Sequence, residues 1–118
     1  MCIELKVFGG FSDCFRCDIT DEVDKHLFGS ADGFNSYVYV NAGDFGKKSL
    51  YIRRPGSTIG CIKLDSTGCI TAIEFNECNV KEGRSKCLDE SMLQVEAMFL
   101  GQRITNPFRG GEVQCLLL

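Results

Sequence analysis

The chain has 118 residues, of which 44% are hydrophobic and 25% charged, and this composition excludes a disordered or fibrous protein. Its length is sufficient for one hydrophobic core, so we expect a single domain over residues 1–118. The net charge of −3 argues against general affinity for nucleic acid, although residues 35–64 form a basic segment with five lysines and arginines and a single acidic residue.

The first predicted element is a strand at the start of the chain. Ile3, Leu5 and Val7 alternate with polar side chains, which is the period of a strand that turns one face to the core. A signal peptide would instead have an uninterrupted apolar stretch here, and no apolar run reaches the roughly 18–20 residues of a membrane-spanning helix. We therefore expect a cytoplasmic protein.

A short strand over residues 15–19 and a short helix over residues 21–28 are predicted next. Thr20 is a suitable N-cap for this helix, the acidic first turn suits the positive end of the helix dipole, and Gly29 suits the helix end. Because the helix contains few apolar residues, we expect it to lie on the surface with one narrow contact stripe.

Residues 35–76 are predicted to form a β-meander, because runs of apolar, β-branched and aromatic residues alternate with turn-forming clusters. The predicted strands are 37–42, 49–54, 58–64 and 69–75. A type I turn with a glycine bulge at Gly68 would join the last two. The register predicted for this last hairpin places Leu64 opposite Ile70, Ile62 opposite Ala72, Cys61 opposite Ile73 and Ile59 opposite Phe75. Both faces of the hairpin would then be apolar, so we expect it at the centre of the sheet.

The main helix is predicted over about residues 89–100. Its apolar residues recur with helical spacing: Leu88, Met92, Val95 and Phe99. Ser91 and Gln94 resemble a capping box, and Gly101 suits the helix end. Pro107 and the pair Gly110 and Gly111 indicate a turn before a closing strand over residues 113–118. The predicted fold class is α+β: an antiparallel β-meander of about five to seven strands with one main helix packed on the sheet.

Eight cysteines are the most unusual feature of the composition. Without an export signal we expect no disulfides. An alternative is a zinc-stabilised binding module, in which the metal is held by Cys14, Cys17, Cys78 and Cys87. The spacing of the second pair fits structural zinc sites poorly, so the leading interpretation has no metal and no cofactor. The last four residues match a prenylation box at Cys115, but Val113 and the absence of a preceding basic run favour a closing strand over a lipid anchor.

Catalytic motifs are missing from the sequence. His26 is the single histidine, and we expect it to be a solvated side chain of the short helix. The motif around Lys47 is not a P-loop, because its first glycine is replaced by Asn41. A cysteine-dependent enzyme using His26 is the third interpretation. The sequence favours a binding function over an enzymatic one.

The tyrosines suggest where a partner binds. All three lie in the basic segment, and if Val38, Val40, Leu50 and Ile52 face the core, the opposite face carries Tyr37, Tyr39, Tyr51 and Arg53. Tyrosine and arginine dominate binding hot spots. The alternative is that the tyrosines pack beneath another part of the same chain. The leading interpretation is a small protein-interaction module, such as an inhibitor or adaptor of a larger macromolecule, that contacts another protein through these four residues with Lys47 and Lys48.

Overall fold

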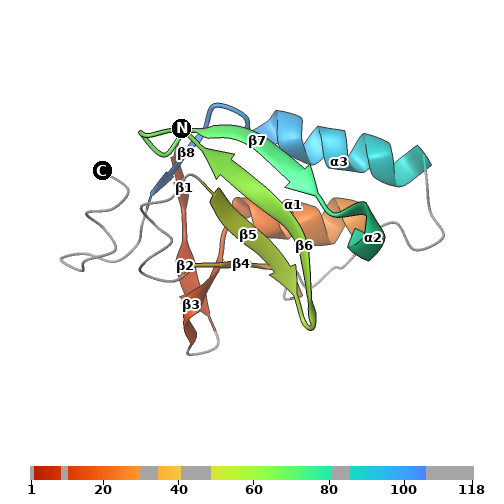
Figure 1. Ribbon diagram of the computed structural model, residues 1–118, viewed down its shortest axis with the longest axis horizontal. Coiled ribbons are helices and arrows are strands. Elements are labelled where there is room, and N and C mark those ends of the chain that lie inside the picture. The colour runs from red at the N-terminus through yellow and green to blue at the C-terminus, as the bar shows by residue number, and fades with distance from the viewer. Residues whose placement is uncertain (1, 9–10, 30–34, 41–48, 81–85, 106–118) are drawn as a thin grey trace.

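The computed structural model describes residues 2–8, 11–29, 35–40, 49–80 and 86–105. Within these residues the fold is α+β, as the sequence predicts, with a six-stranded antiparallel sheet as its main feature (Figure 1). Neighbouring strands in the sheet are also consecutive in the chain, so the whole sheet is a meander. Its strands are β2 (Lys6–Phe8), β3 (Phe11–Arg16), β4 (Tyr37–Tyr39), β5 (Ser49–Arg54), β6 (Ser57–Leu64) and β7 (Ile70–Phe75).

In the described ranges the sheet is accompanied by α1 (Asp18–Leu27), α2 (Glu77–Val80) and α3 (Lys86–Phe99). In Figure 1, α1 lies behind β5 and β6, and α3 lies along β7. The two longer helices contact each other, and the core lies between them and the sheet. None of the helices described is long and apolar enough to cross a membrane.

Helix α3 confirms the helical pattern in the sequence, because Leu88, Met92, Val95 and Phe99 are all buried. The helix begins at Lys86 rather than at residue 89, so Ser91 lies inside the helix and the predicted capping box is wrong. The predicted end is right: Gly101 has a φ of +82°, the left-handed conformation in which glycine ends helices.

Helix α1 begins three residues earlier than predicted and is more deeply buried. Cys17, not Thr20, is the N-cap, and β3 ends at Arg16. The Thr20 hydroxyl accepts the backbone N–H of Cys17 at 3.0 Å and donates to the Cys17 carbonyl oxygen at 2.7 Å, so Thr20 lies in the first turn of the helix. The earlier start adds Ile19 to the buried stripe with Val23 and Leu27, so the contact of this short helix with the core is wider than predicted, while Asp18, Asp21 and Lys25 on its other side are exposed.

The predicted first strand is divided at Leu5 into two strands that belong to different sheets. Before Leu5, β1 (Cys2–Glu4) pairs in parallel with β8 (Arg103–Thr105), a strand that the sequence analysis missed. After Leu5, β2 pairs with β3 and forms one edge of the meander. Ile3 and Leu5 are buried as expected, but Val7 is 41% exposed because it lies on this edge strand.

The hairpin of β6 and β7 has a different register from the predicted one. Leu64 does lie opposite Ile70, but a shift between Lys63 and Leu64 places Ile62 opposite Ile73 and Cys61 opposite Glu74. The bulge puts the apolar residues on the core side and Lys63 and Glu74 on the other side, so the hairpin is not apolar on both faces. The strand order places β7 at the edge of the described sheet, whereas β6 lies between β5 and β7.

The other predicted strands have mixed outcomes. β5 has the predicted bounds, 49–54, whereas β4 ends at Tyr39, and residues 41 and 42 of the predicted strand lie outside the described residues. The turn near Pro107 and the closing strand over residues 113–118 lie outside the described residues, and so does Cys115.

Candidate functional site

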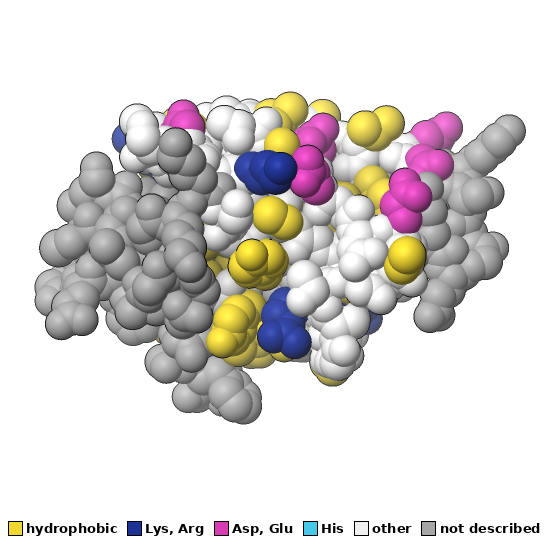
Figure 2. Space-filling model, viewed as in Figure 1, with side chains coloured by type: hydrophobic (Ala, Val, Ile, Leu, Met, Phe, Trp, Pro, Cys, Tyr) yellow, Lys and Arg dark blue, Asp and Glu magenta, His cyan; other side chains and the backbone are white. Residues whose placement is uncertain are grey.

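The face of the sheet opposite α1 and α3 carries a line of side chains that crosses four strands. Backbone pairing places Cys14 next to Tyr39, Tyr39 next to Tyr51, and Tyr51 next to Cys61. Since directly paired residues in an antiparallel sheet point to the same side, these four side chains form one line across β3, β4, β5 and β6. We call this line the tyrosine row. In Figure 2, hydrophobic side chains (yellow) run over the middle of this face, with Lys or Arg side chains (dark blue) near both ends of the run.

A second line of side chains lies beside the tyrosine row. Tyr37 is paired with Arg53, and the ring of Phe8 packs against Tyr37 with 5.5 Å between the ring centroids. The guanidinium carbon of Arg53 lies 5.3 Å from the centre of the Tyr39 ring, which is the geometry of a cation–π contact. The Nε of Arg53 is buried and finds no acceptor among the described residues. Arg53 is therefore placed above an aromatic ring, and the described residues supply no acceptor for its Nε.

In β4 and β5, the alternate residues that were predicted to face the core are the ones that are buried. Val38, Val40, Leu50 and Ile52 are fully buried or nearly so. The structure thus brings Tyr37, Tyr39, Tyr51 and Arg53 onto one face. Tyr51 is 44% exposed, and Tyr37 and Tyr39 are half-buried, so the described part of the chain leaves these rings accessible. Lys47 and Lys48 lie outside the described residues.

Arg54 and Lys63, the other described basic residues of residues 35–64, have partners within the protein. Arg54 lies on the core side of β5, where its guanidinium carbon is 3.6 Å from the centre of the Phe28 ring and its Nη1 is 3.5 Å from Asp24 Oδ1. Lys63 is on the exposed side and lies 3.2 Å from a carboxylate oxygen of Glu74. Of the described cations in the segment, Arg53 is the one placed among the tyrosines.

Asp24 is a buried carboxylate that links α1 to the sheet. Its two oxygens accept the backbone N–H of Ser36 at 3.0 and 3.3 Å, and Arg16 donates to one of them at 3.1 Å. Arg16 also donates to the backbone carbonyl oxygen of Ser36 and to Asp21, and Arg54 approaches Asp24 from β5. These contacts fix the residue that precedes Tyr37 and hence the start of β4. Sequence analysis missed this cluster, because Asp24 looks like one of several surface acids.

The four candidate zinc ligands have different environments. Cys14 belongs to the tyrosine row, Cys17 is buried in the core, and Cys78 is exposed on α2. The side chain of Cys87 is not among those described. Within the described part of the chain, no three His, Cys, Asp or Glu side chains converge to form a metal site.

His26 interacts within its own helix. Its Nδ1 lies 3.0 Å from the backbone carbonyl oxygen of Glu22 and 3.0 Å from a carboxylate oxygen of the same residue. The ring is therefore largely shielded from solvent, and the prediction of a solvated side chain is wrong.

The thiol of Cys17 is expected to make stability depend on alkaline pH. Burial raises its pKa from 9.0 to about 11, while hydrogen bonds from the backbone of Thr20 and Ile19 act in the opposite direction. Because the folded protein holds this proton more tightly than the unfolded chain, the free energy of unfolding should fall between about pH 9 and pH 11. This difference in pKa corresponds to about 3 kcal/mol.

Urea unfolding at a series of pH values, followed by circular dichroism, measures this effect. The comparison is with Cys17→Ser, which retains a capping side chain and does not titrate, so that the effect of this thiol is separated from every other effect of alkaline pH. The parent should lose more stability than the variant as the pH rises. Parallel curves would show that the thiol ionises as easily in the folded protein as in the unfolded chain.

No family model, no curated protein and no solved structure matches this chain. The function is therefore argued from the geometry of the described residues.

Proposed function

We propose that this protein is a small cytoplasmic interaction module that acts by binding another protein through the tyrosine row and Arg53. The observation that carries the proposal is Arg53 stacked on Tyr39, on a sheet face that none of the described helices covers. An inhibitor or adaptor of a larger macromolecule, such as a nucleic-acid enzyme, would act in this way.

Physical chemistry favours these residues as binding anchors. Tyrosine offers a large apolar ring with a polar tip, and a side chain that is already ordered loses little conformational entropy on binding. Tyr39 and Tyr51 are held side by side by strand pairing, and Tyr37 is held by Phe8. A partner surface that covers them would bury apolar area on a preformed, rigid platform.

Arg53 suggests the chemistry of the partner. The Nε of Arg53 is buried and has no acceptor in the described part of the chain, so this guanidinium is partly withdrawn from water, and an anion at its terminal nitrogens interacts with it more strongly than with an arginine in open water. We infer that the partner presents a carboxylate next to apolar or aromatic side chains. The carboxylate would bind Arg53, and the apolar groups would cover the tyrosine row.

The test has two steps. The parent protein is used to capture partners, and the binding kinetics of each captured partner are then measured with Tyr39→Ala and Arg53→Ala. Each substitution is expected to cost about 1–3 kcal/mol of binding free energy, mainly through faster dissociation, because anchors determine residence time. Replacing Lys47 and Lys48 with serine is expected to slow association and to flatten its dependence on salt, because charges at the rim act at long range.

Lys25→Ala provides the matched control, because Lys25 is exposed on α1, in the helical layer on the other side of the sheet. It should bind like the parent. Circular dichroism verifies that all variants are folded. If folded Tyr39→Ala and Arg53→Ala bind like the control, the tyrosine row is structural and the proposal is wrong.

A further inference from the structure

Exposed apolar side chains are concentrated on the outer side of α3. Among the described residues, five large hydrophobic side chains are exposed, and three of them belong to this part of the chain: Leu93 at 66%, Met98 at 37% and Leu100 at 45%. Ala97 is exposed between them. Leu100 continues the helix by one residue, because its backbone N–H donates to the carbonyl oxygen of Glu96 at 3.0 Å. A concentration of apolar side chains like this one indicates an interaction surface.

Leu93, Ala97 and Leu100 form a single stripe, because residues at positions i, i+4 and i+7 lie on the same side of a helix. The buried residues of α3 follow the same spacing on the side that faces the core, from Leu88 to Phe99. Helix α3 is therefore apolar on two sides, and its own core covers one of them. We call the exposed side, with Leu93, Ala97 and Leu100, the α3 stripe.

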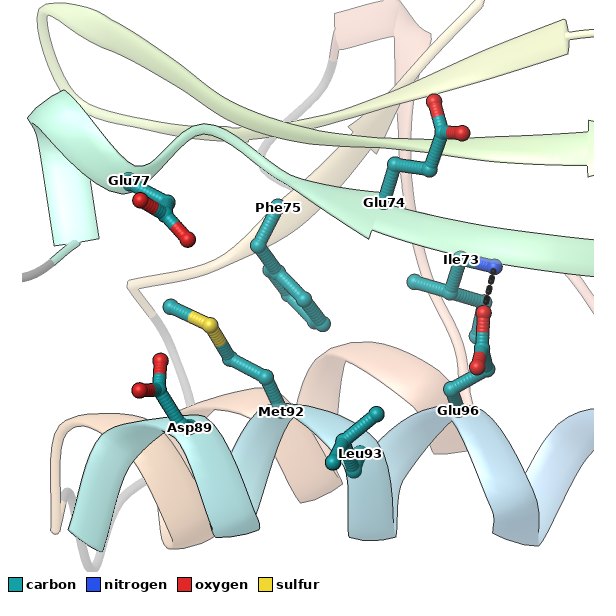
Figure 3. Close-up of a pocket in the computed structure, with 8 residues that line it drawn as sticks. All are labelled: Ile73, Glu74, Phe75, Glu77, Asp89, Met92, Leu93 and Glu96. Atoms are coloured by element: carbon teal, nitrogen blue, oxygen red, sulfur yellow. Dashed lines mark hydrogen bonds between the residues drawn. The ribbon is translucent and has the colours of Figure 1, made fainter. Parts of the chain in front are cut away.

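An acidic groove of about 650 Å³ lies beside the α3 stripe, between α3 and β7, and Leu93 belongs to both (Figure 3). Glu96 accepts the backbone N–H of Ile73 at 3.1 Å, on the sheet side of the helix, and Glu74 lies 3.2 Å from Lys63. The other two carboxylates of the groove also interact within the protein: Glu77 and Asp89. Because none of these four carboxylates is free to select a charged partner, we expect the stripe to be recognised through its apolar side chains.

The α3 stripe is complementary to a second copy of itself. In an antiparallel pair of α3 helices related by a two-fold axis, Leu93 of each copy meets Leu100 of the other, and the axis passes beside Ala97. The small side chain of Ala97 allows the two helices to approach closely, so that the leucines on either side interdigitate. Glu90, on the outer side of the stripe, would lie at opposite ends of the pair, about 20 Å from its copy, so the two carboxylates would not repel each other.

The size of this contact indicates a reversible dimer. Helix α3 has 14 residues and is therefore about 21 Å long. A contact made by one helix of each copy falls below about 1,200 Å² of buried surface, the range of weak and transient complexes. Each copy also has its own core, in which α3 already buries Val95 and Phe99, so folding does not require the second copy.

We propose that two copies of this chain associate reversibly through antiparallel packing of their α3 stripes. The α3 stripe lies in the helical layer, on the other side of the sheet from the tyrosine row. The dimer is consequently independent of the function proposed for the tyrosine row.

Sedimentation equilibrium of the full chain tests the proposal, with a reductant present to prevent disulfide links between copies. We expect a monomer–dimer equilibrium with a dissociation constant of the order of 100 μM. Leu93→Ser should weaken association about tenfold, because each dimer contains this leucine twice. Ala97→Arg and Ala97→Glu should each be monomeric alone, because two like charges would meet at the axis, and an equimolar mixture of the two should dimerise again.

Val7→Ser and Val7→Arg are the matched controls, because Val7 is 41% exposed on β2, at the opposite edge of the sheet from β7. These variants and Tyr39→Ala should dimerise like the parent, and circular dichroism verifies that every variant is folded. A parent that stays monomeric up to about 1 mM overturns the proposal. Dimers of the single Ala97 variants, or a mixture of them that stays monomeric, also overturn it. Loss of the dimer in Tyr39→Ala would overturn it as well, because the copies would then meet through the tyrosine row.

Discussion

Replacing Asp24 with alanine is expected to lower the free energy of unfolding by about 3–5 kcal/mol, a large part of the stability of a domain of this size. Asp24 is fully buried, and its loss would leave Arg16 and Arg54 without their shared counter-charge. The backbone N–H of Ser36 would also lose its acceptor inside the protein. Urea unfolding followed by circular dichroism measures the change.

Asp21→Ala is the matched control, because Asp21 bonds the same arginine at 2.7 Å but its side chain is 62% exposed. Removing this exposed partner should cost less than about 1 kcal/mol. Similar unfolding midpoints for the two variants would show that burial gives Asp24 no special role.

Val95→Asp should prevent folding or cause aggregation. Val95 is completely buried on the face of α3 that packs into the core, and a carboxylate without a partner in such a place costs several kcal/mol. The expected result is the loss of the cooperative thermal transition, or a soluble fraction too small to measure.

Ala97→Asp introduces the same side chain on the exposed side of the same helix. It should change the stability by at most about 1 kcal/mol. A Val95→Asp variant that melts within a few degrees of Ala97→Asp would mean that α3 does not pack against the sheet through this face.

The sequence predicts well the strands and helices that are recognised by the spacing of apolar residues within a short stretch of chain. Alternation gives the bounds of β5 and the phase of the tyrosines, and helical spacing gives the buried face of α3. The residues at which helices and strands begin and end depend on individual hydrogen bonds. This explains why α1 begins earlier than predicted: Thr20 is a suitable N-cap when judged from the sequence alone, but in the structure its hydroxyl bonds to the backbone of Cys17. A bulge is also invisible in a periodic pattern, so the register predicted for β6 and β7 fails after its first pair.

The candidate site could be predicted only in part for a related reason. Placing Tyr37, Tyr39, Tyr51 and Arg53 on one face requires alternation alone. Their neighbours Phe8, Cys14 and Cys61 come from other strands, and they follow only from the order of strands and their register. Asp24 and the acidic groove arise where distant elements meet, and nothing in the local sequence distinguishes these carboxylates from ordinary surface acids.

The parallel pair of β1 and β8 has a consequence for how the chain folds during synthesis. Every pairing in the meander joins consecutive strands, so these contacts are local and can form as the chain leaves the ribosome. Cys2 pairs with Arg103, about 100 residues later, and Ile3 and Ile104 are both buried at this junction. β1 is therefore made long before its partner β8, and we expect nascent chains that stop before β8 to expose Ile3 and to be targets for chaperones.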